Sequence, residues 1–587
     1  MMMDEAHLEI AALAWFEEVG WELGLSSDMN PSGVEQSFYT SGSNELRDRP
    51  DLIYSHAQQT SDGEVIIETQ LREAFECINS WIPQAEREEA YQDVLAMVKR
   101  HQPDLLANNR QFHQWLIEGF PITIRNAEGE KQQERAFIID FQTLDNNCFL
   151  VRNQVTIVGR KTRRPDIVAY VNGLPMVVLE LKSPLHKDSS YEANLDALNQ
   201  LNTYKHELHE LFISNAVLVV SDGLQARFGS LSAGFDRFMP WRTIKNEKDR
   251  PYLEYELETL IKGLFEPKRF MNYLQNFILF TDNRHQISKI VAGYHQYHAV
   301  ENALEATRYA TSPESGDGKI GVIWHTQGSG KSYSMAFYVG KIIKTPELQN
   351  PTIVVVTDRN DLDDQLFATF TRAKALFNNT EPVQASTRAE LRQRLAERAA
   401  GGIIFTTVQK FAPDEKGGEH PVLNERRNII VISDEAHRTQ YGLNARMNEE
   451  GLYTYGYAKY MRDAIPNAAF IGFTGTPIEE SDRSTRAVFG ENVSVYDIQD
   501  AVEDGATVPI YYEARLAQLK MDDSLLDDYS NQLEDILKDA DVEEREKVKQ
   551  KWSRLERLAG APERLKMLAQ DMICLLYTSP SPRDATL

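Results

Sequence analysis

The sequence predicts an α/β protein in which a mixed α/β domain is followed by a parallel α/β domain and a helical segment. The 587-residue chain is longer than the ~250–300 residues at which a single hydrophobic core stops growing. From residue 136 short β-rich runs are joined by turns, and Asn172-Gly173 between two apolar runs is a strong hairpin signal. From residue 284 five Val/Ile-rich runs alternate with helical stretches, which indicates a parallel sheet covered on both faces.

Composition and charge exclude several classes of protein. Hydrophobic residues make up 42% and charged residues 26% of the chain, as in ordinary soluble globular proteins. The longest purely apolar runs have about five residues, whereas a membrane helix needs ~20, so we expect no membrane partner. Three cysteines cannot build a disulfide framework or a four-ligand zinc site, which favours a cytoplasmic location. With a net charge of −25, any DNA contact needs a local basic surface or a partner protein.

The expected elements divide the chain into four regions. Residues 1–280 form the first domain, with its core at 136–225, and residues 284–512 form the second. Residues 513–573 are expected to be a helical linker toward a second lobe. Residues 574–587 show no periodicity and are expected to derive from a translated sequencing adapter, with an ordinary disordered tail as the alternative interpretation. In the first domain we expect helices over 11–23, 71–81 and 191–210, and strands within 136–140, 149–159, 165–182 and 216–223. In the second domain we expect strands within 319–326, 352–358, 402–407, 428–437 and 468–476.

A phosphate-binding loop follows the first strand of the second domain. Residues 326–332 (TQGSGKS) lie between that strand and a helix, and their backbone N–H groups can face a phosphate because the glycines permit close approach. The residues expected to form this cradle are Gly328, Ser329 and Gly330. Lys331 is expected to reach the β- and γ-phosphates of ATP, and Ser332 to hold Mg²⁺. The full pattern has glycine where this chain has His325, and a chance GSGKS loop is the alternative interpretation.

Residues 428–437 (NIIVISDEAH) supply the second half of an ATP site. Asp434 leaves a buried strand and is expected to bind Mg²⁺ through water, while Glu435 is placed to orient or deprotonate the attacking water. The tetrapeptide DEAH alone is a weak signal, because acidic tetrapeptides are common. Combined with the phosphate loop on a neighbouring strand, it becomes a strong one.

These segments resemble the motifs of superfamily 2 helicases and translocases. GSGKS, DEAH and the later residues 474–477 (TGTP) are similar to motifs I, II and III of that family, whose motor lobes have a RecA-like fold. The resemblance implies that Gln296, with Tyr294 nearby, recognises adenine; an exposed helix glutamine is the alternative interpretation. It also implies roles in coupling the ATP state to DNA contacts for His437, Thr474 and Thr476.

A second constellation, in the first domain, indicates a nuclease. Asp166, Glu180 and Lys182 have the form P-D, a gap and E-x-K, and two carboxylates converging on Mg²⁺ beside a lysine suit phosphodiester hydrolysis. Glu180 and Lys182 lie two residues apart on a strand and therefore share a face. E-x-K triplets are also frequent by chance. The basic residues just before the motif, including Arg163 and Arg164, can bind DNA phosphates.

The hairpin register decides whether the two carboxylates meet. A strict two-residue Asn172-Gly173 turn pairs Asp166 with Leu179 and puts Glu180 on the opposite face. A metal site therefore requires a three-residue loop or a bulge, which shifts the register by one residue and makes Asp166 face Glu180. We then expect Asp166, Glu180 and Lys182 to form one metal-binding cluster.

The order of these motifs resembles the restriction (R) subunit of type I restriction–modification enzymes over about residues 5–573. The resemblance implies a restriction-endonuclease-like nuclease domain, a RecA-like motor lobe, ATP and Mg²⁺ as cofactors, and double-stranded DNA as substrate. It implies specificity and methyltransferase subunits as partners. Gln200 and Tyr204 in QLNTY look like the Q-x-x-x-Y motif of this family and share a helix face. Residues 149–159, 357–363, and 496–498 together with 504–510 are also similar to segments of the family.

Two other functions are compatible with the sequence. The motors of this superfamily have two RecA-like lobes and only one is recognisable here, so we expect a fragment without full activity. The chain could be a translocase or helicase whose nuclease-like domain is inert, which a Mg²⁺-dependent cleavage assay on Asp166→Ala would distinguish. It could also be a non-catalytic nucleotide- and DNA-binding fragment, which a measurement of ATP turnover would reveal.

Overall fold

The computed structural model describes most of the chain up to residue 508 and a short segment near its end. The described residues are 5–24, 65–100, 103–125, 130–184, 187, 189–283, 286–357, 360–411, 422–436, 446–447, 453–454, 457–476, 483–508, 565–566 and 568–573. The chain divides into two compact units, Met1–Val508 and Pro509–Leu587. In the second unit the described residues are helical. Most of the predicted linker 513–573 and all of 574–587 lie outside the described residues.

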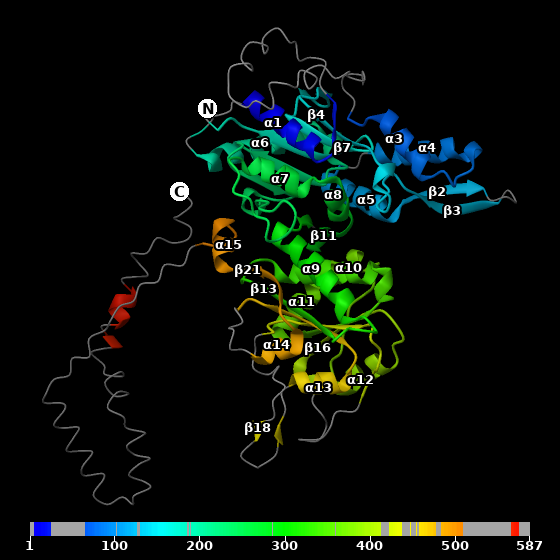
Figure 1. The fold of residues 1–587 in the computed structure, drawn as a ribbon. Helices are drawn as coiled ribbons and strands as arrows, with labels where there is room; N and C mark the ends of the chain where they lie inside the picture. The colour runs from blue at the N-terminus through cyan, green and yellow to red at the C-terminus, as the bar shows by residue number, and fades with distance from the viewer. Residues whose placement is uncertain are drawn as a thin grey trace, which may run out of the picture. The chain divides into compact units, whose positions relative to one another are not determined.

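The first sheet is mixed, as the sequence predicts. Its strands lie in the order β1-β4-β7-β8-β9-β10, with β1 parallel to β4, β8 parallel to β9, and the other neighbours antiparallel. Figure 1 shows this sheet with α1 and α6 beside it. The strands are β1 (Glu22–Gly24), β4 (Phe149–Asn153), β7 (Ile167–Val171), β8 (Leu174–Leu181), β9 (Val217–Ser221) and β10 (Ala226–Gly229).

Two helices cover opposite faces of the first sheet. Residues of α1 (Glu5–Glu18) share a hydrophobic core with Ile167 and Leu179, whereas residues of α6 (Ser190–Glu207) share another with Val168 and Val178. Because side chains alternate along a strand, Glu180 lies on the α6 face with Val178. The predicted helix over 191–210 is therefore present as α6. The remaining helices around this sheet are α3 (Glu68–Ile78), α4 (Gln84–Val98), α5 (Leu105–Glu118), α7 (Glu256–Leu264) and α8 (Pro267–Asn276).

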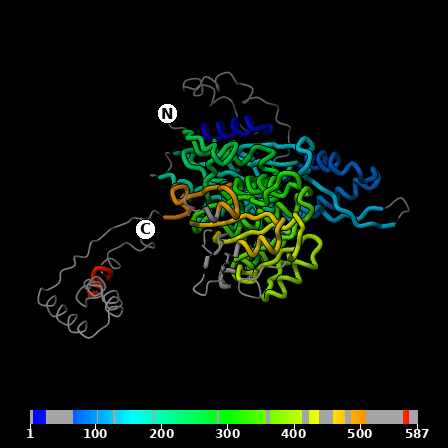
Figure 2. Tube along the Cα trace, turned by 60° about the horizontal axis from the view of Figure 1, so that its bottom comes forward, coloured from blue at the N-terminus to red at the C-terminus, as the bar shows by residue number. Residues whose placement is uncertain are grey.

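Several short strands differ from the sequence predictions. β2 (Phe120–Arg125) and β3 (Lys131–Ala136) form a hairpin in a region expected to be helical up to about residue 130, and the strand expected at 136–140 ends at Ala136. Buried and exposed residues alternate along β2, the period-two pattern of a strand. Figure 1 and Figure 2 both show this hairpin extending away from the first sheet. Other small hairpins are β5 (Ile157–Val158) with β6 (Thr162–Arg163), β11 (Ile278–Asn283) with β12 (Gln286–Val291), and β18 (Arg446–Met447) with β19 (Tyr453–Thr454).

The second sheet is wholly parallel among the described residues, and this confirms the predicted fold class. Its strand order is β15-β16-β14-β17-β20-β13-β21. The five predicted strands are β13 (Lys319–His325), β14 (Thr352–Thr357), β16 (Ile403–Thr407), β17 (Ile429–Ser433) and β20 (Ala469–Thr474). Two edge strands join them, β15 (Val383–Gln384) and β21 (Asn492–Tyr496). The helices are α9 (Tyr294–Ala310), α10 (Lys331–Lys344), α11 (Asn360–Arg372), α12 (Arg388–Ala396), α13 (Tyr457–Ala464), α14 (Arg483–Phe489) and α15 (Ile498–Glu503).

The strand order corrects one expectation. The strands that end at the phosphate loop and at the DEAH segment, β13 and β17, are not neighbours, because β20 lies between them and pairs with both. The carboxyl-terminal ends of β13, β20 and β17 still lie at the same end of the sheet, since these strands are parallel. No described helix is long and apolar enough to span a membrane.

Candidate functional site

The β7–β8 hairpin contains the register shift that the sequence analysis required. Val171 pairs with Leu174 across the Asn172–Gly173 turn, and the register then shifts by one residue between Ala169 and Tyr170. Beyond the bulge, Ile167 pairs with Leu179, so that the next residue, Asp166, comes opposite Glu180. A single bulge in β8 thus brings the two carboxylates to the same side of the sheet.

Glu180 and Lys182 form a buried ion pair at the end of β8. Lys182 Nζ donates to Glu180 Oε1 over 2.8 Å and to the carbonyl oxygen of Leu181 over 2.9 Å. The two residues are 0% and 8% exposed. The second carboxylate oxygen of Glu180, Oε2, is buried and has no hydrogen-bond partner in the part of the chain that the structure describes. Burial, followed by the charge of Asp166, raises the pKa of Glu180, and Lys182 opposes this shift.

Asp166 is held through both of its carboxylate oxygens. Oδ2 accepts a hydrogen bond from the backbone N–H of Leu181 over 2.7 Å, and Oδ1 accepts one from Gln154 Nε2 over 3.3 Å. Burial raises the pKa of Asp166 to about 6, although the Leu181 hydrogen bond and the charge of Lys182 lower it. A cation that compensates both carboxylates would relieve the cost of burying them.

A third carboxylate, Glu9, comes from α1 and was missed by the sequence analysis. Glu9 is 5% exposed and accepts hydrogen bonds from Gln154 Nε2 over 2.8 Å and Asn153 Nδ2 over 3.2 Å. Burial, followed by the charge of Asp166, raises the pKa of Glu9 to about 7. Its place on the buried side of α1, between apolar residues, is the signal that could have identified it. Within the described ranges, no three acidic, histidine or cysteine side chains come close enough together to hold a metal by themselves.

Gln200 and Tyr204 meet on α6, above the carboxylates. Gln200 Nε2 donates to the Tyr204 hydroxyl over 2.6 Å, as the i, i+4 spacing predicts. Burial, followed by the charge of Glu180, raises the pKa of Tyr204 to about 12, and the Gln200 hydrogen bond lowers it. The charge of Asp166 also raises the pKa of Tyr204.

The basic residues before Asp166 are only partly available to DNA. Arg163 Nε donates to Glu207 over 2.5 Å, and Lys161 Nζ lies 2.9 Å from the same carboxylate. These two contacts lower the pKa of Glu207. Arg164 is exposed. A DNA phosphate at Arg163 would therefore have to compete with Glu207.

The phosphate loop follows β13 and ends where α10 begins. Gly328 and Gly330 have φ angles of 88° and 83°, in the left-handed region that glycine adopts without strain. Lys331 Nζ folds back onto the loop and donates to the carbonyl oxygens of His325 over 3.1 Å and Thr326 over 3.3 Å. Ser332 is partly exposed in the first turn of α10.

The carboxylates of the DEAH segment and Gly475 of the TGT segment lie near Lys331. Burial lowers the pKa of Lys331, and the charges of Glu435 and Asp434 oppose that shift. The backbone of Glu435 has a φ of 50°, a conformation that residues other than glycine rarely adopt. A methyl group on Gly475 would lie 3.0 Å from Lys331 Nζ. Thr474 and Thr476 are joined across Gly475 by hydrogen bonds of 3.1 and 3.2 Å. His437 lies outside the described residues.

The residue that departs from the phosphate-loop pattern has a structural partner. His325 is fully buried, and its Nε2 lies 2.9 Å from the hydroxyl oxygen of Ser494 in β21. The next residue, Thr326, donates its backbone N–H to the carbonyl oxygen of Tyr496 over 2.9 Å. These two contacts attach one side of the phosphate loop to β21.

Residues 496–504 extend this support. The Tyr496 ring stacks on His295 with 4.0 Å between ring centroids, and His295 Nε2 lies 3.1 Å from the carbonyl oxygen of Ser329 in the loop. The Tyr496 hydroxyl donates to Asp504 Oδ2 over 2.9 Å, and Arg242 Nε donates to Asp504 Oδ1 over 3.0 Å. The phosphate loop is therefore connected by direct contacts to a segment that precedes the second sheet in sequence.

Gln296 lies at the phosphate loop, with both ends of its amide engaged. Oε1 accepts from the backbone N–H of Gly293 over 2.9 Å, and Nε2 donates to the carbonyl oxygen of Gly330 over 3.0 Å. Gln296 is 6% exposed, so it is not the exposed helix glutamine of the alternative interpretation. Tyr294 is 2% exposed and packs at an angle against the ring of Tyr496.

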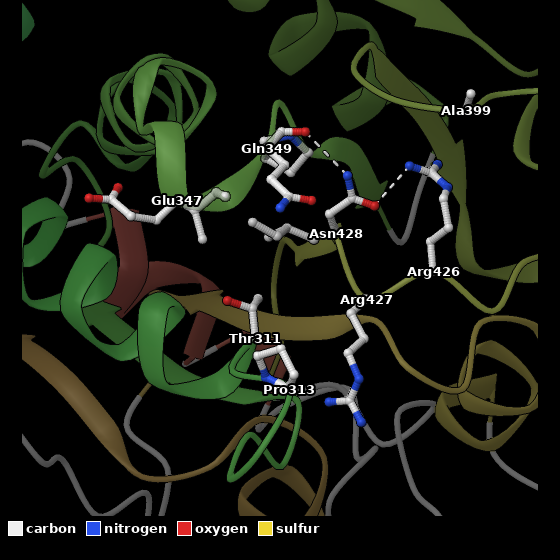
Figure 3. A pocket seen from close by; sticks show the side chains of 11 residues that line it. Thr311, Pro313, Glu347, Gln349, Ala399, Arg426, Arg427 and Asn428 are labelled. Carbon is white, nitrogen blue, oxygen red and sulfur yellow. Dashed lines mark hydrogen bonds between the residues drawn. The ribbon is translucent and has the colours of Figure 1, made fainter.

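A pocket of about 420 Å³ lies at the end of the second sheet where the parallel strands begin, opposite the end that carries the phosphate loop. Figure 3 shows it between residues that precede β14 and β17, where the carbonyl of Gln349 and the side chains of Asn428 and Arg426 are joined by hydrogen bonds. None of the predicted site residues lines it. Since the phosphate loop follows the other end of β13, this pocket is separate from the candidate nucleotide site.

Comparison with known proteins extends the assignment over both sheets. Residues 2–237 match the family described as the N terminus of the type I restriction enzyme R protein, and residues 295–546 match the family described as the SWI2/SNF2 ATPase. The type I restriction enzyme HindI endonuclease subunit of Haemophilus influenzae is 44% identical over 578 residues, which are 97% of this chain and 51% of that protein. The provisionally named type I restriction enzyme MjaIXP endonuclease subunit of Methanocaldococcus jannaschii is 34% identical over 547 residues, which are 89% of this chain and 49% of that protein.

The chain spans about half the length of these two curated relatives. The two family matches follow one another in the same order as the two sheets. The chain therefore belongs to the family of type I restriction enzyme endonuclease subunits, the R subunits.

Proposed function

We propose that this chain forms the nuclease and the ATP-binding motor lobe of a type I restriction R subunit, which moves double-stranded DNA with ATP and cuts it with Mg²⁺. The observation that carries the nuclease half is the register shift in the β7–β8 hairpin, which sets Asp166 opposite Glu180. If the E-x-K triplet were a chance occurrence, there would be no reason to expect a bulge that sets its glutamate, Glu180, opposite Asp166.

The residues of the first site fit a divalent cation. Among the described residues, Glu180 Oε2 is buried without a hydrogen-bond partner and Lys182 is the one cation bonded to Glu180, while Asp166 lies across the strand pair. Asp166 and Glu180 would hold Mg²⁺, which would polarise the scissile phosphate and activate a water molecule. Lys182 has three N–H groups and uses two of them on Glu180 and Leu181. The third N–H can stabilise negative charge that develops on the phosphate.

The second site suits the triphosphate of ATP. Lys331 donates to two loop carbonyls and can turn to the phosphates of a bound nucleotide, which are stronger acceptors. Ser332 and Asp434 would hold Mg²⁺, and Glu435 would orient the attacking water. Gln296 fixes the loop through Gly330 and, near the predicted adenine site, is also a candidate to read the base.

The proposal includes partners and location. Specificity and methyltransferase subunits would supply sequence recognition, which suits a chain with a net charge of −25 and few basic clusters. Gln200 and Tyr204 on α6, and Arg164 before Asp166, are candidates to contact DNA near the nuclease site. His437, Thr474 and Thr476 are candidates to couple the ATP state to DNA. We propose a cytoplasmic location, where these partners and DNA are found.

Two single variants test the two halves of the proposal separately. The purified 587-residue chain is incubated with supercoiled plasmid DNA and Mg²⁺, and its binding of a fluorescent ATP analogue is measured in parallel. Asp166→Ala should abolish cleavage and leave nucleotide binding unchanged, whereas Lys331→Ala should abolish nucleotide binding. Lys319→Ala, at the other end of β13, is the control for Lys331. Plasmid cleavage that survives Asp166→Ala would contradict the assignment of Asp166 to the nuclease site.

A further inference from the structure

We propose that Gln154 is a positioning residue of the metal site, which fixes Asp166 and Glu9 through a single side-chain amide. This inference rests on the proposed nuclease function, because it assigns a role to a residue that supports the same carboxylates. Gln154 follows β4 directly and belongs to neither the P-D nor the E-x-K motif.

The contacts of Gln154 converge on two acidic residues. Its Nε2 donates to Glu9 Oε1 over 2.8 Å and to Asp166 Oδ1 over 3.3 Å, so both amide hydrogens are used on carboxylates. Its backbone N–H donates to the carbonyl oxygen of Asp166 over 2.8 Å. Gln154 therefore holds Asp166 at both its main chain and its side chain.

The other oxygens of the two carboxylates are held by different groups. Asp166 Oδ2 accepts from the backbone N–H of Leu181, and Glu9 Oε2 accepts from Asn153 Nδ2. Gln154 thus completes a set in which every oxygen of Asp166 and Glu9 has a fixed donor. Ligands that are fixed before the metal arrives lose less conformational freedom when it binds, and the partners that orient metal ligands strongly affect affinity.

The backbone of Gln154 adopts a conformation that is unfavourable for its residue type. Its φ is 49°, in the left-handed region that residues with a Cβ rarely occupy. Such conformations persist where surrounding contacts impose them, and they concentrate at functional sites. Here glycine would be the residue of lowest strain, but glycine has no amide to place between Glu9 and Asp166. The use of glutamine at this position is explained by the amide.

Gln154→Gly separates the amide from the backbone strain. It removes the side-chain donors of two buried carboxylates, which costs stability, and it relieves the left-handed conformation, which offsets part of that cost. The free energy of unfolding without metal should therefore change little enough for the variant to stay folded. The control is Gln349→Gly, because Gln349 is another glutamine in the left-handed region, with a φ of 53°. It lines the pocket beside the second sheet and not the nuclease site. Both variants are made in the 587-residue chain.

Calorimetric titration with Mn²⁺, without nucleotide or DNA, measures the site directly. The signal assigned to the nuclease site is the part that Asp166→Ala removes. We expect Gln154→Gly to weaken this Mn²⁺ affinity by about 10- to 100-fold, the range seen when a partner of a metal ligand is lost. Gln349→Gly should leave it unchanged, and Gln154→Gly should remain fully folded without metal at the temperature of the titration.

Each outcome decides one claim. Unchanged Mn²⁺ affinity in Gln154→Gly, with Asp166-dependent binding in the unmodified chain, would overturn the role of Gln154 and leave the proposed nuclease site standing. Weaker affinity together with partial unfolding of Gln154→Gly without metal at the titration temperature would show a purely structural role and would also overturn it. Absence of any Asp166-dependent Mn²⁺ binding in the unmodified chain would overturn the proposed site and this inference together.

Discussion

Lys182 Nζ donates a hydrogen bond to Glu180 Oε1 over 2.8 Å, while Oε2 of the same carboxylate is buried and has no partner among the described residues. The two carboxylate oxygens of Glu180 therefore differ, because Lys182 compensates Oε1 and Oε2 remains available to bind a cation. The side chain of Lys182 is 9% exposed and that of Glu180 is fully buried. This arrangement suits a carboxylate that orients a lysine and also binds a cation.

Removal of the lysine charge should stop DNA cleavage without affecting the nucleotide site. For Lys182→Ala we expect the rate of Mg²⁺-dependent plasmid cleavage to fall by about 10²–10³, the usual cost of losing a group that stabilises developing charge. Binding of a fluorescent ATP analogue should not change. Lys187→Ala is the matched control, since Lys187 is a nearby exposed lysine paired with Asp196. Cleavage at the unmodified rate in Lys182→Ala would contradict the role given to this residue.

Stabilisation by Mg²⁺ should depend on pH in a defined direction. Burial raises the pKa of Asp166 to about 6 and that of Glu9 to about 7. A carboxyl group with a raised pKa in the folded state stabilises the fold at low pH, and this contribution is lost as the pH rises through that pKa. Without metal, the free energy of unfolding should therefore fall between about pH 4.5 and about pH 8.

A divalent cation compensates the charge that ionisation creates, so the Mg²⁺-induced rise in unfolding temperature should grow across the same range of pH. The measurement is thermal unfolding with and without Mg²⁺ at several pH values, with Asp166→Ala as control. An Mg²⁺ effect of equal size in acid and at neutral pH would refute this prediction.

Gln296→Ala should weaken the binding of inorganic triphosphate as well as of ATP. The amide of Gln296 holds the carbonyl of Gly330 at the end of the phosphate loop, so its loss should disturb the phosphate contacts. We expect about a tenfold loss for triphosphate, because one hydrogen bond that positions the loop is removed. Any additional loss for ATP measures recognition of the base. Unchanged triphosphate affinity would contradict the positioning role.

Asp504 should contribute to the stability of the contact between Arg242 and the second sheet. Its side chain is 6% exposed and accepts hydrogen bonds from both Arg242 and Tyr496. Asp504→Ala leaves these donors without their partner and should lower the free energy of unfolding by about 2–4 kcal/mol, measured by chemical denaturation. Glu503→Ala, at the exposed neighbouring residue, should change it little. A similar small effect for both variants would contradict this account.

The sequence predicts the second sheet well for a physical reason. Its central strands are runs rich in Val and Ile that are buried on both faces, so local composition and the packed position agree. The edge strands β15 and β21 are shorter or less apolar and were not predicted as strands. The order of β13, β20 and β17 also depends on crossovers that no local pattern encodes.

In the first site, the motif residues were predictable but their supporting groups were not. Asp166, Glu180 and Lys182 lie within one hairpin, so chain geometry alone required the bulge that the structure has. Glu9 and Gln154 reach the same site from α1 and from the end of β4, and only the tertiary fold brings them together. A buried glutamate within an apolar helix and a glutamine with positive φ are signals that become interpretable with coordinates.

Anomalous diffraction from crystals of the chain soaked in Mn²⁺ tests the central claim most directly, because it locates the ion without relying on activity. The account predicts a Mn²⁺ peak within bonding distance of a carboxylate oxygen of Asp166 and of Oε2 of Glu180, on the side of the sheet covered by α6, and no such peak in Asp166→Ala crystals. A fully occupied Mn²⁺ site elsewhere, with no peak between these two carboxylates, would contradict it.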